Sequence, residues 1–168
     1  MITPGLFSSL TDDWATPRRY FEQLRKFFPF DLDVCASAKN FKCNDYFDLA
    51  DNGLAQNWDN RVVWMNPPYG KSIIHWVKKA SETKGIVVGL LPSRTDPVWF
   101  QEYVLDKAIV VYLGGRLRFG DESKPAPFGS ALAVWGDSGF TYEQLKVIAS
   151  NPFLPSSPFV ADSNLKVA

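Results

Sequence analysis

The chain has 168 residues, the size of one domain, and 46% of them are hydrophobic, enough for a core without a metal or disulfide. Its 18 basic and 18 acidic side chains cancel, which excludes binding to polyanions by net charge alone; nucleic acid would require positive charge gathered on one face. We see no signal peptide, no apolar stretch near the roughly 20 residues of a membrane span, and too few cysteines and histidines for a zinc site. We therefore expect a cytoplasmic protein with no membrane segment and no metal.

Predicted helices alternate with apolar strands along the chain. Thr16 followed by Pro17 is typical of a helix start, because threonine caps the first amides and proline suits the first helical position. This helix is expected to run to about residue 28. The later elements are predicted in this order: strand 30–35, strand 61–65, helix 72–83, strand 85–91, helix 97–105, strand 108–113, strands 116–119 and 130–135, and helix 142–149.

This alternation predicts an α/β fold with a mostly parallel sheet and helices on both faces. Strands 116–119 and 130–135, joined by a Gly- and Pro-rich loop, are predicted to form an antiparallel C-terminal pair. We expect residues 1–150 to form one domain and residues 151–168, rich in Pro and Ser, to be an irregular tail. Ligands bind beyond the carboxyl ends of strands in such sheets, so the loops after positions 33, 65, 91 and 113 are candidate site loops.

The segment Asn66-Pro67-Pro68-Tyr69 follows a predicted buried strand and precedes a predicted helix. Two prolines lock two φ angles and remove two amide donors, so the loop is stiff and offers mainly acceptors: the Asn66 side-chain oxygen and the carbonyls of Asn66 and Pro67. Two fixed acceptors can hold the two N–H bonds of an aromatic amino group and aim its lone pair at an incoming methyl group. Tyr69 can stack on the base that carries the amino group. The alternative is a tight structural turn with a buried tyrosine.

The loop resembles that of amino-methyltransferases, in which an Asp/Asn/Ser-Pro-Pro-Tyr segment binds the target amine. More closely, the chain resembles the phage-encoded Dam-type DNA N6-adenine methyltransferases. The resemblance also covers these segments: Asp13-Trp14-Ala15-Thr16-Pro17; Leu32-Asp33-Val34-Cys35-Ala36-Ser37; Asp51-Asn52-Gly53-Leu54-Ala55-Gln56; Leu91-Pro92-Ser93-Arg94-Thr95-Asp96; Gly115-Arg116-Leu117-Arg118-Phe119-Gly120; and Ala126-Pro127-Phe128.

The resemblance implies a Rossmann-like S-adenosylmethionine-dependent methyltransferase fold and transfer of a methyl group from S-adenosylmethionine to the exocyclic N6 amine of adenine in double-stranded DNA. Asn66, Pro67 and Tyr69 would be the catalytic residues, acting on a base flipped out of the duplex. It also implies a cytoplasmic location, in a bacterium or a phage-infected host, and suggests protection from restriction. The oligomeric state and the DNA recognition sequence stay open.

On the cofactor side, the resemblance makes residues 33–37 the first cofactor motif. Asp33 would hold the ammonium of the donor, and the small residues Cys35, Ala36 and Ser37 would let the protein backbone approach it closely. This loop has no glycine, unlike the glycine-rich turn of the broader superfamily. Further residues assigned to the cofactor by the same resemblance are Trp14, Thr16 and Pro17, at a helix start that suits the methionine carboxylate, and Asn66. Asp51 is our choice for the cofactor nucleoside, with Asp45 and Asp48 as rivals.

On the DNA side, Arg94 is predicted to hold a phosphate or a base edge. Arg116 and Arg118 alternate on one predicted strand face next to Phe119, which suggests a phosphate clamp with an aromatic platform; the alternative is a solvated strand face. The loop 120–128 and segment 39–57 are the candidates for recognising the DNA sequence. Other substrates that remain open are cytosine N4, RNA adenine and protein glutamine, and a catalytically inert DNA-binding relative is a further alternative.

Overall fold

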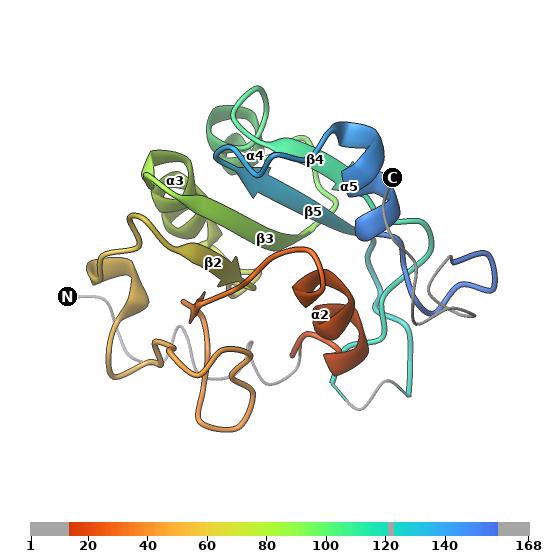
Figure 1. The fold of residues 1–168 in the computed structure, drawn as a ribbon, viewed down its shortest axis with the longest axis horizontal. Helices are drawn as coiled ribbons and strands as arrows, with labels where there is room; N and C mark the ends of the chain where they lie inside the picture. The colour runs from red at the N-terminus through yellow and green to blue at the C-terminus, as the bar shows by residue number, and fades with distance from the viewer. Residues whose placement is uncertain (1–13, 121–122, 158–168) are drawn as a thin grey trace.

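A computed structural model of the chain describes residues 14–120 and 123–157 (Figure 1). Within these ranges the backbone forms a five-stranded sheet of order β1-β2-β3-β5-β4. The strands are β1 (Leu32–Asp33), β2 (Val62–Met65), β3 (Ile86–Pro92), β4 (Ile109–Tyr112) and β5 (Ser130–Trp135). The first three pair in parallel, and β5 runs antiparallel to both of its neighbours, β3 and β4, so β4 has the direction of β3. The mostly parallel sheet is confirmed.

The predicted antiparallel pair of 116–119 with 130–135 is wrong. Both edges of β5 are taken, one by β3 and the other by β4, and residues 116–119 lie in the loop between β4 and β5. Leu117 and Phe119 are buried, whereas Arg116 is exposed and Arg118 is half-buried. The alternating pattern is therefore real, but it comes from a loop that packs one side against the core.

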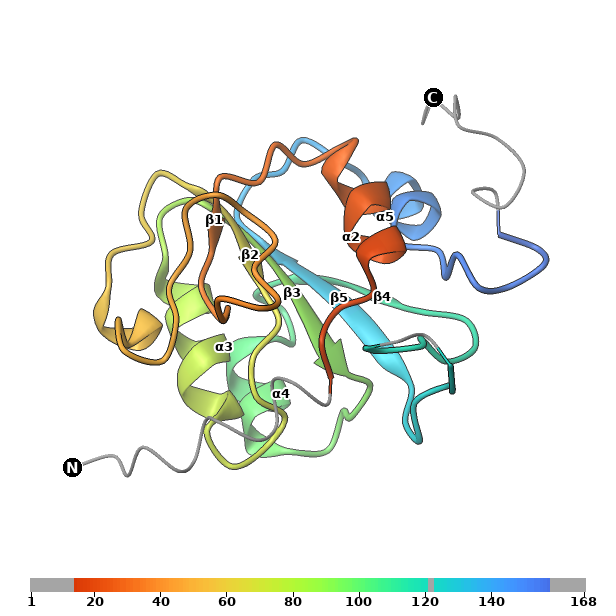
Figure 2. The ribbon, with the colours of Figure 1, turned by 90° about the horizontal axis from the view of Figure 1, so that it is seen from below.

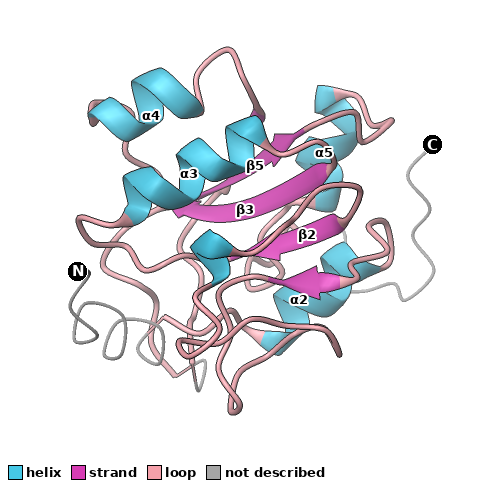
Figure 3. Ribbon diagram, turned by 90° about the vertical axis from the view of Figure 1, so that its left-hand side faces the viewer, coloured by secondary structure: helices cyan, strands magenta, loops and turns pink. Residues whose placement is uncertain are grey.

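Helices cover both faces of this sheet, as predicted. They are α2 (Arg18–Arg25), α3 (Ile73–Glu82), α4 (Val98–Tyr103) and α5 (Tyr142–Ile148), with a short 3-10 turn, η2 (Gly53–Ala55). Figure 2 shows α2 and α5 on one side of the strands and α3 and α4 on the other, and Figure 3 shows α3 crossing in front of β3. Among the described residues, no helix is long and apolar enough to cross a membrane.

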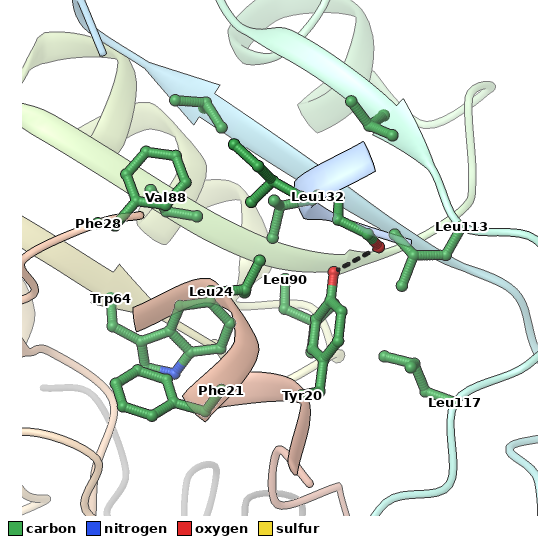
Figure 4. Packing of buried hydrophobic residues seen from close by; sticks show 14 of the residues in the cluster. Tyr20, Phe21, Leu24, Phe28, Trp64, Val88, Leu90, Leu113, Leu117 and Leu132 are labelled. Carbon is green, nitrogen blue, oxygen red and sulfur yellow. Dashed lines mark hydrogen bonds between the residues drawn. The ribbon is translucent and has the colours of Figure 1, made fainter. Parts of the chain in front are cut away.

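Successive strand residues enter two separate cores, because side chains alternate across a sheet. Trp64 and Val88 join the core beneath α2 and α5, while Val63 and Val87 join the core beneath α3 and α4. Figure 4 shows the first of these cores, where the buried Tyr20 hydroxyl donates to the Ala149 carbonyl at 3.2 Å and links α2 to the end of α5.

Two predicted boundaries shift. Pro17, rather than Thr16, is the N-cap residue of α2, and the Thr16 side chain accepts a hydrogen bond from Asn66 instead. The predicted strand 30–35 shrinks to Leu32–Asp33, and a short segment around Tyr46 bridges to Asp33 in parallel at the outer edge of β1. Of the predicted tail, residues 151–157 form turns and residues 158–168 lie outside the described part of the chain.

All four candidate loops meet at one edge of the molecule. The parallel direction of β1, β2, β3 and β4 places their carboxyl ends together, and the antiparallel β5 begins at that edge. The loop 113–129, which joins β4 to β5, therefore both starts and ends there.

Candidate functional site

A shallow cleft, open to solvent, lies at the carboxyl ends of β1 and β2. Three parts of the chain form its walls: the segment before α2, the end of β1 with the loop that follows it, and the end of β2. The lining residues are Ala15, Thr16, Asp33, Cys35, Asn40, Lys42, Trp64 and Asn66. The predicted residues Thr16, Asp33, Cys35 and Asn66 are thus brought together around one space.

Asn66 is held from two directions. Its Nδ2 donates to the Trp14 carbonyl at 2.9 Å and to Thr16 Oγ1 at 2.9 Å. A backbone carbonyl can only accept, so the Trp14 contact settles which end of the amide is the nitrogen. Asn66 Oδ1 is then left buried, with no hydrogen-bond partner among the described residues. A buried acceptor without a donor costs roughly 1–3 kcal/mol, which a ligand N–H would recover.

The rest of the proline loop is packed and rigid. Pro67 and Pro68 are buried, so their fixed φ angles are reinforced by the core around them. The Tyr69 hydroxyl donates to the Leu90 carbonyl on β3 at 3.0 Å, which anchors the ring across the strand ends. Burial raises the pKa of Tyr69 well above its usual range, so the phenol stays protonated and cannot act as a base.

Four aromatic rings gather beside Asn66. Trp14 packs edge-on against Phe128 with ring centroids 4.7 Å apart and against Phe119 at 5.6 Å, and Tyr69 packs edge-on against Phe128 at 5.5 Å and Phe119 at 6.4 Å. We call Trp14, Tyr69, Phe119 and Phe128 the aromatic cluster. Phe128 was not among the predicted site residues, although it lies in one of the resembling segments and in the loop 120–128 proposed to read the DNA sequence.

The loop 113–129 is tied in place by hydrogen bonds to backbone carbonyls. Gly120 N–H donates to the Ala15 carbonyl at 3.0 Å, so the loop is attached to the segment before α2. Arg116 donates to the Ala126 carbonyl at 3.2 Å, and Arg118 donates to the Ser123 carbonyl at 3.0 Å. Both arginines therefore brace their own loop, and each keeps further guanidinium N–H groups for another partner.

Asp33 is a buried carboxylate, only 3% exposed, at the tip of β1. Its Oδ1 accepts from the Cys35 N–H at 3.2 Å and its Oδ2 from the Lys42 N–H at 3.0 Å. Burial raises its pKa to about 6 despite these two bonds and the nearby charge of Lys42. Burial, with the charge of Asp33 added, also raises the pKa of Cys35 well above its usual range, so this thiol stays neutral.

Lys42 and Asn40 also line the cleft. The sequence analysis placed both only within segment 39–57, for reading DNA, and assigned neither to the cofactor. Lys42 Nζ donates to the Asn40 carbonyl at 2.8 Å. They belong to an irregular loop between β1 and β2, where no hydrophobic period or motif marks a residue as inward-facing. Nothing short of the tertiary structure could have selected them.

The other predicted residues lie outside the lining of the cleft. Ala36 and Ser37 continue the turn that leaves it, and Pro17 begins α2. Arg94 is exposed in the loop after β3. Asp51 is exposed in a turn where its Oδ2 accepts from the Asp48 N–H at 2.9 Å. No group of three or more His, Cys, Asp or Glu side chains suited to a metal ion occurs in the described ranges.

Comparison with known proteins gives consistent matches. A family model described as DNA N-6-adenine-methyltransferase (Dam) matches residues 5–134. A DNA N-6-adenine-methyltransferase of Escherichia phage T1 is 31% identical over 137 residues, which is 78% of this chain and 57% of that protein. A DNA N-6-adenine-methyltransferase of Haemophilus phage HP1 (strain HP1c1) is 33% identical over 107 residues, or 61% of this chain and 62% of that protein. The chain thus spans less than two thirds of the length of either relative.

Proposed function

Since the chain belongs to the Dam family of DNA N-6-adenine-methyltransferases, we propose that it transfers a methyl group from S-adenosylmethionine to the exocyclic N6 amine of adenine in double-stranded DNA. The observation that carries this proposal is the state of Asn66, whose buried Oδ1 has no donor although its Nδ2 is fixed by two partners. The sheet, with β5 inserted antiparallel between β3 and β4, is assigned to the Rossmann-like methyltransferase fold.

The cleft has the groups that the donor's methionine end requires. A carboxylate (Asp33) and the segment that leads into the amino end of α2 border one space that opens to solvent. When bound, S-adenosylmethionine supplies an electrophilic methyl group on a sulfonium, which is a good leaving group. The protein therefore has mainly to position the two reactants.

Asn66 is placed to orient the target amine. Its Oδ1 accepts one N–H of the adenine amino group and the Pro67 carbonyl accepts the other, which leaves the nitrogen lone pair free to point at the methyl carbon. With the donor bound, the amine held by Asn66 and Pro67 would take the methyl group as the sulfonium leaves as a thioether, and one amine proton would pass to solvent. Tyr69 takes no part in proton removal, because its phenol stays protonated.

The aromatic cluster provides the surface for the target base. A base inside a duplex cannot reach the end of β2, so the adenine must be flipped out. Tyr69 and Phe119, with Phe128 beside them, offer ring faces or edges on which the purine packs, at about 1–3 kcal/mol per stacked base. This arrangement keeps the predicted roles of Tyr69 and Phe119 and adds Phe128 to them.

The turn that contains Asp48 and Asp51 is assigned to the donor nucleoside. Asp45 is committed elsewhere, since its Oδ2 lies 2.7 Å from Arg61 Nη2. Asp48 follows the short segment that bridges to Asp33 in parallel, so it lies toward the same edge as the cleft, and Asp51 is joined to it. Asp48 Oδ2 and Asp51 Oδ1 accept no hydrogen bond from the described residues.

The DNA backbone is assigned to the basic side chains of the carboxyl-edge loops. Lys71, Arg94 and Arg116 are exposed there, in the loops after β2, β3 and β4, and Arg118 is half-buried. With Asp96 as the exposed acidic neighbour of Arg94, these basic side chains are the groups proposed to meet phosphates.

The direct test is methyl transfer from a labelled donor. Unmodified double-stranded DNA should gain N6-methyladenine, detected by mass spectrometry of its nucleosides. RNA, protein and DNA that lacks adenine should stay unlabelled. Transfer only to cytosine, RNA or protein would replace adenine N6 as the target. Donor binding without any transfer would favour an inert DNA-binding relative.

A further inference from the structure

Lys42 supplies a positive charge inside the cleft. It comes from the loop between β1 and β2, and its backbone N–H donates to Asp33 Oδ2 at 3.0 Å, which places it next to the end of β1. Its side chain is half-buried and lines the cleft together with Asp33 and Asn66. The cleft therefore contains an ammonium as well as a carboxylate.

This ammonium is only partly satisfied. A lysine has three N–H donors, and Lys42 uses one of them on the Asn40 carbonyl. None of the ion pairs between described side chains includes Lys42. Both oxygens of the nearby Asp33 already accept backbone N–H groups. Partial burial lowers the pKa of Lys42, and the negative charge of Asp33 acts in the opposite direction. The Lys42 ammonium therefore keeps two N–H donors for a ligand in the cleft.

The amino end of α2 adds to the same positive field. Ala15 and Thr16, just before this eight-residue helix, line the cleft. The first helical hydrogen bond of α2 runs from the Phe21 N–H to the Pro17 carbonyl. The backbone N–H groups before Phe21 therefore have no acceptor within the helix. Helix amino ends attract anions, and here that attraction adds to the unpaired charge of Lys42.

The methionine moiety of S-adenosylmethionine is a zwitterion, with one ammonium and one carboxylate on the same carbon. We propose that Lys42 binds the α-carboxylate of the donor, with the amino end of α2 on its other side, while Asp33 serves the α-ammonium. This inference rests on the proposed function, because it assumes that the cleft takes this donor. A DNA phosphate is the competing anion, but Lys42 is half-buried in the cleft wall, whereas the arginines at positions 94 and 116 are exposed.

The test compares two ligands by isothermal titration calorimetry, without DNA: S-adenosylhomocysteine and its decarboxylated analogue, which keeps the adenosine, thioether and ammonium. Lys42→Met should weaken S-adenosylhomocysteine by about tenfold or more, the loss expected for one charge-assisted hydrogen bond, and the analogue by less than about twofold. Lys42→Arg should restore much of the affinity for S-adenosylhomocysteine. Lys26→Met, an exposed lysine at the far end of α2, should leave both affinities unchanged.

Equal weakening of both ligands by Lys42→Met would overturn the assignment, and so would no weakening of either. If Lys42→Met lost DNA affinity in a separate DNA titration but kept its S-adenosylhomocysteine affinity, Lys42 would instead contact a DNA phosphate, and the assignment would be overturned. If wild-type protein binds neither ligand, the proposed function itself fails. Should Lys42→Met not fold in thermal melts, the wild type still decides: it must bind S-adenosylhomocysteine at least about tenfold more tightly than the analogue.

Discussion

Replacing Asn66 with alanine removes the unpartnered Oδ1 together with the two bonds from Nδ2 to the Trp14 carbonyl and Thr16 Oγ1. We expect the rate of methyl transfer to fall by at least about 100-fold, the loss that follows removal of one oriented polar contact at a reacting centre. Donor affinity should persist, because the carboxylate and the ammonium of the cleft are untouched.

The same change should cost little stability. Each lost hydrogen bond contributes about 0.5–1.5 kcal/mol, and deletion of the partnerless Oδ1 offsets part of that loss. A net loss of about 1 kcal/mol lowers the melting temperature of a chain of this size by roughly 2–4 °C. Unfolding therefore cannot account for the expected drop in rate at assay temperature.

Single-turnover methyl transfer, with donor binding measured by calorimetry, separates these effects. Asn66→Asp keeps an acceptor for the amine but loses the donor to the Trp14 carbonyl, so its rate should fall between those of wild type and Asn66→Ala. Glu102→Ala changes an exposed side chain of α4, on the face of the sheet opposite α2 (Figure 2), and should be neutral. An Asn66→Ala rate within about threefold of wild type would refute the assigned role.

Three further predictions concern Asp33 in the cleft, the turn at Gly136, and Arg94 among the basic side chains of the carboxyl-edge loops. Burial raises the pKa of Asp33 to about 6, so protonation below that pH removes the carboxylate proposed for the donor ammonium. Calorimetry should therefore show S-adenosylhomocysteine binding about tenfold weaker at about pH 5 than at neutral pH. Asp33→Asn should abolish this pH dependence. Gly136 has φ 82°, and an added Cβ would lie 2.0 Å from the Gly85 carbonyl oxygen. Gly136→Ala should therefore lower the free energy of unfolding, measured in urea, by about 3 kcal/mol or more. Gly120→Ala, at φ 64° with open space around it, should lower it by only about 1–2 kcal/mol; equal losses would contradict the steric argument. Arg94→Ala should reduce by about 1 the slope of log DNA affinity against log salt concentration; an unchanged slope would remove Arg94 from the phosphate contacts.

The conformation of the proline loop could be predicted from neighbouring residues alone. A buried strand stopped by Asn66-Pro67-Pro68 forces a stiff, acceptor-rich turn whatever surrounds it, since proline restricts its own backbone and that of the residue before it. The sheet edge that carries this turn also followed from strand–helix alternation. By contrast, the strand predicted at 116–119 failed, because a loop packed on one side has the same alternation of buried and exposed residues as a strand.

The amino-acid order alone determined the α/β class, the helices on both faces and the loop that presents Asn66, because backbone restriction and hydrophobic period act over a few residues. Only the tertiary structure decided that β5 lies between β3 and β4, that the rings of Trp14 and Phe128 meet beside Tyr69, and that Lys42 enters the cleft. These depend on contacts between residues far apart in the chain, and irregular loops carry no period from which such contacts can be read. The proposed donor site thus combines residues that the sequence could indicate, such as Asp33 and Asn66, with Lys42, which only the fold brings to them.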